Sequence, residues 1–192
     1  MKKLLAIFMW LASSWAIAFT TSPSIPSQFI NDKDLKNHEF IANWLTNVGP
    51  SKTDREDADR FFSLGLKAKQ AKNWSGAAKM FGESMMRYPS PHALYESADS
   101  ELRMLRQVRA REGFPPERVR KDMNNALDLY ESSLAANGVT KTLSAQEIER
   151  IEQYVFCLKS YLQSPQPQTD CQPTVYFSSE QVKSKRNRNS KH

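Results

Sequence analysis

Residues 61–89 read FFSLGLKAKQAKNWSGAAKMFGESMMRYP and hold the most specific pattern in this chain of 192 residues. Apolar residues recur three and four positions apart on both sides of the short polar break KNWS, which is the spacing of two helices. Small residues, Gly65 and Ala77, stand where paired helices would cross closely. Phe81 has the size to fill the space between them, and Pro89 would end the second helix. The stretch therefore predicts an antiparallel helix pair.

The same apolar spacing predicts helices through most of the remaining chain. Only six Gly occur in the whole sequence, which argues against a β-sandwich or barrel with its many tight turns. Asn137-Gly138 is a helix C-terminal signal, and Ser144 with Glu147 forms a capping box that begins the last helix. We expect six antiparallel helices with short connections, over 36–48, 55–71, 75–88, 91–111, 116–137 and 144–163.

The order of positions in the central stretch resembles the tetratricopeptide repeat (TPR), a 34-residue helix pair defined by aromatic, Leu-Gly, Ala, aromatic and Pro positions. The match runs over 58–91 and departs from the family at Ala68, where Tyr is preferred. A weaker second copy over 92–137 starts at Tyr95 and resumes late at Ala126. The resemblance implies an exported bacterial member of the TPR or Sel1-like repeats, folded as an all-α, TPR-like stack of helix pairs. An ordinary helical bundle is the alternative.

Residues 1–18 are typical of a secretory signal peptide. Lys2 and Lys3 form the positive start, residues 4–11 an apolar run, and Ala16-Ile-Ala18 a small-residue cleavage site. The run is too short to span a bilayer, so we expect no stable membrane anchor after cleavage and a periplasmic or secreted protein. The expected organisation is a signal peptide 1–18, a flexible leader 19–35, a helical domain 36–163, and a disordered tail 164–192 that is Pro-rich and then basic.

The tail supplies +3 of the formal net charge of +6, and Lys2 and Lys3 supply a further +2. Five basic residues lie between 183 and 191, so the folded part is close to neutral once the signal peptide is removed. Binding to nucleic acid requires a basic face on the folded domain. We therefore expect no nucleic-acid partner.

Residue types that carry catalysis or metal binding are scattered in this sequence. His38, His92 and His192 lie far apart, with no Cys or carboxylate at the spacing of metal ligands. No nucleophile elbow, phosphate-binding loop or zinc-protease motif occurs. We expect no catalytic residues, no metal and no cofactor, and the chain is predicted not to be an enzyme.

The two cysteines, Cys157 and Cys171, are predicted to form a structural disulfide. An exported protein enters an oxidising compartment, and the sequence has no C-x-x-C motif of a redox catalyst. The bond would fold the segment after Leu162 back along the last helix.

The TPR resemblance also implies a binding groove, lined by the first helix of each pair. Its expected positions are Phe62, Leu66, Lys69, Glu96, Ser100 and Arg103. The family's best-known groove holds a peptide's terminal carboxylate with Lys and Asn, where this chain has Phe62 and Leu66. An amphipathic helix or extended peptide therefore fits the apolar strip better. Alternatively, the helix around Trp44 covers Phe62 and Leu66 and closes the groove.

Two functions follow from these expectations. The first is an exported protein–protein interaction module, a periplasmic adaptor or assembly factor that binds a partner in the groove. The second is a small inhibitor or immunity-type protein that binds one partner tightly with slow release. The identity of the protein partner is not encoded in any motif of the chain.

Overall fold

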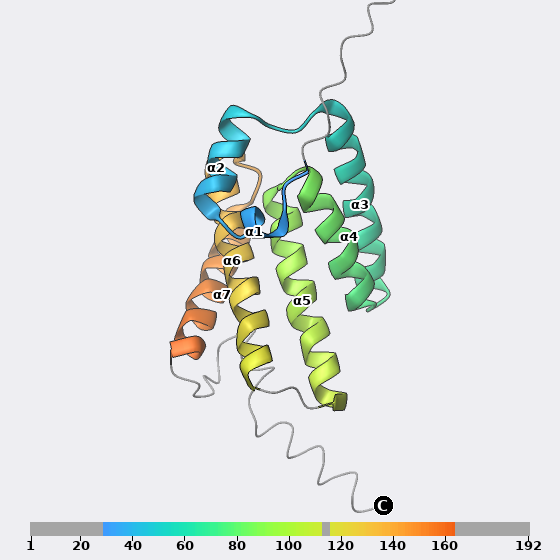
Figure 1. Ribbon diagram of the computed structural model, residues 1–192, viewed down its shortest axis with the longest axis vertical. Coiled ribbons are helices and arrows are strands. Elements are labelled where there is room, and N and C mark those ends of the chain that lie inside the picture. The colour runs from blue at the N-terminus through green and yellow to red at the C-terminus, as the bar shows by residue number, and fades with distance from the viewer. Residues whose placement is uncertain (1–28, 113–115, 164–192) are drawn as a thin grey trace, which may run out of the picture.

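The computed structural model describes residues 29–112 and 116–163, which form α-helices and contain no strand (Figure 1). The expected all-α fold class is therefore confirmed. The proposed signal peptide, the tail and Cys171 lie outside the described residues. The helices are α1 (Asp32–Leu35), α2 (His38–Asn47), α3 (Lys52–Gln70), α4 (Trp74–Arg87), α5 (Pro91–Glu112), α6 (Pro116–Thr140) and α7 (Ala145–Gln163).

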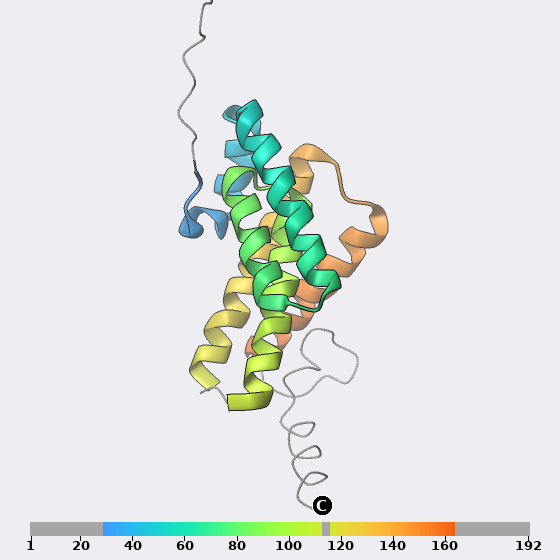
Figure 2. The same cartoon turned by 90° about the vertical axis from the view of Figure 1, so that its right-hand side faces the viewer.

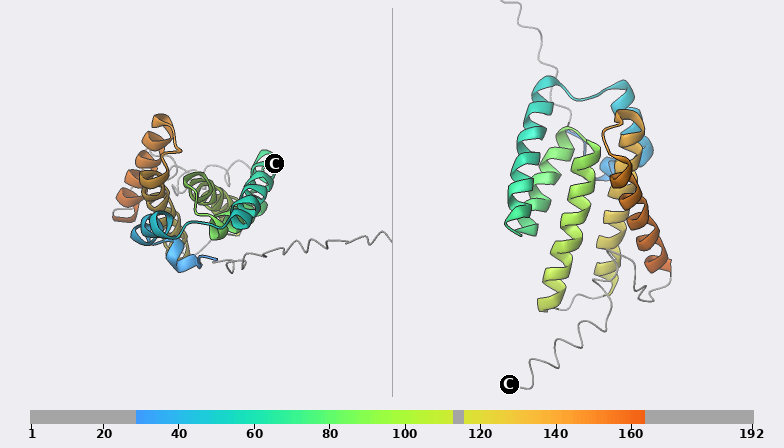
Figure 3. Two further views of the ribbon diagram at one scale, coloured as in Figure 1. Left: turned by 90° about the horizontal axis from the view of Figure 1, so that it is seen from above. Right: turned by 180° about the vertical axis from the view of Figure 1, so that it is seen from behind.

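Helices α3 to α6 pack one after another, each against the next in the chain. Both α2 and α7 then pack on α6, and the link from α2 to α3 crosses one end of the molecule (Figure 1). Seen from above, α3 and α7 stand at opposite ends of the assembly (Figure 3). The segment that carries α1 and helix α7 lie on opposite sides (Figure 2).

The core lies mainly along α5 and α6 and extends to α2 and α7. Within it, apolar side chains recur at helical spacing on each of these helices, as the sequence predicts. The largest fully buried side chains are Tyr130, Phe81, Leu35, Ile41, Leu94, Leu102, Met123, Leu129, Ile151 and Leu158.

Helices α3 and α4 cross closely at Gly65, where the sequence predicts a small residue. A Cβ atom added to Gly65 would lie 2.5 Å from Cε1 of Phe81. Phe62 packs on the same ring, with the two centroids 5.3 Å apart. The crossing therefore uses the missing side chain of Gly65 to seat Phe81, which is fully buried.

The end of α6 differs from the prediction. The helix continues past Asn137-Gly138 to Thr140, and the left-handed residue that follows is Lys141, with φ of 55°. The side chain of Asn137 is buried and accepts a hydrogen bond of 2.9 Å from the backbone N–H of Leu143. Asn137 thus anchors the α6–α7 loop rather than ending the helix.

The capping box at the start of α7 is confirmed. The Ser144 N–H donates to a Glu147 carboxylate oxygen over 2.8 Å, and the Glu147 N–H donates to Ser144 Oγ over 3.3 Å. Hydrogen bonds from Ser144 lower the pKa of Glu147. Both backbone amides are satisfied at the position where the sequence predicts the helix to begin.

The packed part of the chain begins earlier than the boundary between leader and helical domain at residue 36 predicts. Ile30 is 4% exposed, and Leu35 is fully buried in the core. The Ile30 N–H donates a 2.9 Å hydrogen bond to the carbonyl of Met86 in α4. Residues 29–35 therefore form a strap fixed to the helices, which corrects this part of the predicted flexible leader. Among the described helices, none is both long and apolar enough to cross a bilayer.

Candidate binding face

The candidate site is a surface that we call the α3/α5/α7 face. Helix α5 lies at its centre, with Lys69 of α3 bound on one side and Arg150 of α7 on the other. The expected groove residues come only from α3 and α5. The face is made of Leu66, Lys69, Tyr95, Glu96, Asp99, Arg103, Arg150 and Tyr154.

An ion network joins α3 to α5 on this face. Lys69 Nζ pairs with the Glu96 carboxylate and lies 3.6 Å from Oδ2 of Asp99. Arg103 Nε donates to the same Asp99 oxygen over 2.9 Å. The Arg103 guanidinium also lies over the ring of Trp74, 4.8 Å from its centroid. Asp99 therefore links cations from two helices and fixes both side chains.

Cations and carboxylates of this network differ in exposure. The side chains of Lys69 and Arg103 are 28% and 36% exposed, whereas those of Glu96 and Asp99 are 14% and 10% exposed. The carboxylates lie beneath, and the long cationic side chains extend over them towards solvent. An approaching molecule meets the positive groups first.

Three tyrosines join α5, α6 and α7 beneath and beside the network. The ring of Tyr130 is fully buried between those of Tyr95 and Tyr154, at centroid distances of 6.0 and 5.5 Å. Burial raises the pKa of all three phenols, and of Tyr130 most strongly. The Arg150 side chain donates a hydrogen bond to the Tyr95 hydroxyl, which opposes the effect of burial on that pKa. The cluster holds α7 against the face through aromatic contacts.

The expected groove positions fall into two groups. Lys69, Glu96 and Arg103 are brought together in the ion network, and Leu66 is 38% exposed on the same side of α3. Phe62 instead packs against the core, and Ser100 is completely buried. Ser100 therefore cannot contact a ligand directly, and Phe62 contributes mainly to the helix crossing.

Four residues of the face, Tyr95, Asp99, Arg150 and Tyr154, are not among the expected groove positions. Asp99 stands four positions before the expected Arg103 in the same helix, and this local spacing signals an ion pair. Arg150 and Tyr154 join the face only because α7 folds back beside α5, and no local pattern indicates that contact.

Helix α2 does not cover this face. It packs on α6, where Trp44 is 6% exposed, and lies on the other side of the molecule from α3 (Figures 1 and 3). The alternative in which the helix around Trp44 closes over Phe62 and Leu66 is therefore not the observed packing.

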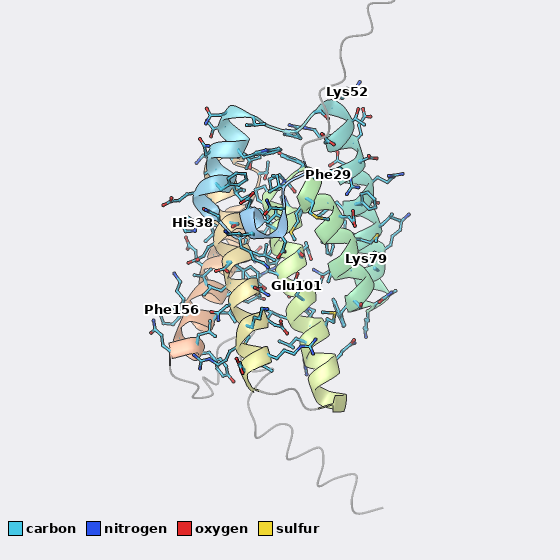
Figure 4. All side chains as sticks on the ribbon, viewed as in Figure 1. Phe29, His38, Lys52, Lys79, Glu101 and Phe156 are labelled. Atoms are coloured by element: carbon cyan, nitrogen blue, oxygen red, sulfur yellow. The ribbon has the colours of Figure 1, made fainter. Side chains whose placement is uncertain are left out.

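A second unusual group, Glu101, lies on the side of α5 that faces the strap (Figure 4). Burial raises the pKa of this carboxyl to about 7. Lys36, which follows the strap, lowers this pKa, whereas Asp32 of the strap and Asp122 of α6 raise it. Ser97 Oγ, 3.5 Å away, is a weak hydrogen-bond donor to it. Glu101 therefore changes charge near neutral pH.

The remaining candidates show little chemistry. His92 Nε2 lies 3.4 Å from a Glu147 oxygen at the start of α7. Within 29–112 and 116–163, no group of three or more His, Cys, Asp or Glu side chains could hold a metal ion. Cys157 is buried in α7, while Cys171 lies outside the described residues, so the disulfide stays a prediction.

Comparison with known proteins adds no family to these observations. No family model matches the sequence, and no curated protein or solved structure matches it significantly.

Proposed function

We propose that this chain is an exported, TPR-like protein–protein interaction module, an adaptor or assembly factor, that binds a peptide or helix of a protein partner on the α3/α5/α7 face. The supporting observation is the convergence of Lys69, Glu96 and Arg103 beside the exposed Leu66, four positions that the TPR resemblance assigns to a groove. An apolar side chain next to fixed ion pairs suits a peptide better than a small reactive substrate.

The arrangement of helices supports the same proposal. Consecutive antiparallel helices from α3 to α6 pack in chain order, as stacked helix pairs do. Helix α7 extends the row formed by α3 and α5, because it contacts α5 through Tyr95. Three helices thereby contribute side chains to one surface.

Export and the disulfide are parts of this proposal. Cleavage after Ala18 would deliver the chain to an oxidising compartment, where Cys157 and Cys171 would close a loop worth roughly 3 kcal/mol in the chain-entropy model. Intact mass of the protein recovered from its host tests both. We expect a start at Phe19 and a mass that increases on alkylation only after reduction; retention of residues 1–18 would refute export by cleavage.

The binding proposal is tested by affinity capture from the native envelope extract with two matched variants. Leu66→Asp places a charge on the α3/α5/α7 face, whereas Leu64→Asp changes a residue that is 42% exposed on another side of the same helix. We expect a partner that is captured by wild type and by Leu64→Asp but lost with Leu66→Asp. Equal capture by all three proteins would place the contact elsewhere.

The same experiment separates the two kinds of binding protein. One stoichiometric partner with slow dissociation supports the inhibitor or immunity-type alternative. Several partners that exchange quickly support an adaptor.

A further inference from the structure

The charge layering of the α3/α5/α7 face decides which kind of peptide it can accept. Glu96 and Asp99 are the least exposed members of the ion network, and each already accepts hydrogen bonds from a cation. A basic ligand side chain would have to displace Lys69 or Arg103 to reach them. Removing one partner of a buried ion pair is costly, because the other charge is left without compensation. The α3/α5/α7 face therefore disfavours the binding of basic ligands.

An acidic ligand side chain, in contrast, can bind without displacing Lys69 or Arg103. The side chains of Lys69 and Arg103 remain partly exposed while they pair with the carboxylates below them. A ligand carboxylate can approach from solvent and share these cations without breaking the internal pairs. The existing carboxylates hold the cations in place, so little side-chain entropy is lost on binding.

A third cation widens this positive surface across α7. Arg150 is exposed and bonded to Tyr95, and Tyr154 lies within electrostatic reach of both Arg150 and Arg103. Cations from α5 and α7 thus act on the same tyrosine edge, and Lys69 of α3 is linked to Arg103 through Asp99. Leu66, one turn before Lys69 on α3, supplies an exposed apolar contact beside them.

We propose that the α3/α5/α7 face selects peptides in which an Asp or Glu side chain stands next to an apolar residue. The carboxylate is shared by Lys69, Arg103 and Arg150, and the apolar side chain packs on Leu66. This inference rests on the proposed function and adds the chemistry of the partner to it. The side-chain carboxylate, rather than the end of a chain, is the recognised group.

The test is a selection of random peptides displayed with their C-termini fused, so that side chains supply the only carboxylates. The exported protein serves as bait, with Leu66→Asp as counter-selection. We expect Asp or Glu beside an apolar residue in the selected peptides. Replacing that Asp by Asn should weaken binding about tenfold at low salt, and added salt should reduce the difference.

Variants of the protein test which cation of the face binds the ligand carboxylate. Arg150→Gln removes an exposed cation of the face, and Lys159→Gln removes a cation of the same helix that pairs with Glu131 instead. We expect Arg150→Gln to weaken the binding of an acidic peptide several-fold and to leave the binding of its Asn version unchanged. Lys159→Gln should change neither affinity. Circular dichroism of both variants checks that the fold is retained.

The outcomes separate the two levels of the proposal. Peptides that require Leu66 but show no acidic enrichment, or that bind equally well with Asn, would overturn the charge selection and leave the binding face intact. Selection of no peptide that depends on Leu66 would overturn both.

Discussion

Gly65 shows how one missing side chain positions two helices. Any residue larger than glycine places a Cβ atom 2.5 Å from the fully buried ring of Phe81, and neither helix backbone can move without disturbing the core. The ring also packs against Phe62, which limits its own rearrangement.

We expect Gly65→Ala to destabilise the protein by about 1–3 kcal/mol, because overpacking outweighs the better helix propensity of Ala. Gly82→Ala in α4 is the matched control, since a Cβ atom there meets no neighbour within 4 Å. It should stabilise the protein by about 0.5–1 kcal/mol. Urea unfolding of both variants measures the two effects, and equal shifts in the same direction would contradict the close crossing.

Glu101 makes stability depend on pH. Because burial raises its pKa from 4.5 to about 7, the folded protein holds a proton that the unfolded chain has released between these values. The free energy of unfolding therefore falls as pH rises from about 4.5 to 7, by up to about 3 kcal/mol from this group.

Glu101→Gln should remove that pH-dependent loss in the free energy of unfolding. We expect the melting temperature of the variant to exceed that of wild type at pH 8 and to equal it near pH 4.5. Glu152→Gln, an exposed carboxyl on α7, should show no such trend. Thermal unfolding across this pH range measures the difference, and a gap that persists in acid would contradict the assigned pKa shift.

Helix α7 depends on its first turn. It contacts the rest of the fold mainly through α6, yet it must hold Arg150 and Tyr154 in place beside α5. The Ser144–Glu147 capping box fixes where it starts and hence the register of both side chains.

Loss of this capping box should destabilise helix α7 measurably. We expect Ser144→Ala to lower the free energy of unfolding by about 1 kcal/mol, whereas Ser75→Ala, an exposed serine in the first turn of α4, should change it much less. Amide hydrogen exchange should show faster opening of the first turn of α7 in Ser144→Ala. Unchanged exchange there would mean that packing alone sets the start of the helix.

The strap of residues 29–35 ties distant helices together. Its Ile30 binds the end of α4, while Leu35 is buried in the core, so the strap spans the side opposite α7 (Figure 2). This contact brings the start of the described chain against its middle.

The strap should contribute to global stability through its buried residue. We expect Leu35→Ala to cost about 2–5 kcal/mol, the usual range for emptying a fully buried leucine site. Phe29→Ala, which truncates a ring that is 58% exposed, should cost less than about 1 kcal/mol. Calorimetry of the two variants measures this contrast, and a small effect of Leu35→Ala would show that the strap packs only superficially.

Local features of the chain were readable from residue order. Helical spacing of apolar residues predicts the six long helices to within a few residues, and Gly65, Phe81 and Ser144 act where their chemistry predicts. These features depend on neighbours three or four positions away, so a single sequence contains the relevant information.

Packing between helices that lie far apart in the sequence decided the remaining features of the fold and of the candidate site. Local spacing cannot show that Arg150 and Tyr154 reach α5, that Ser100 points into the core, or that α2 packs on α6 and leaves the α3/α5/α7 face clear of it. Each depends on which helices share the buried core, a choice made by the volume and shape of all side chains together. The same packing sets the charge order of the candidate site, because it leaves Glu96 and Asp99 less exposed than their cationic partners Lys69 and Arg103.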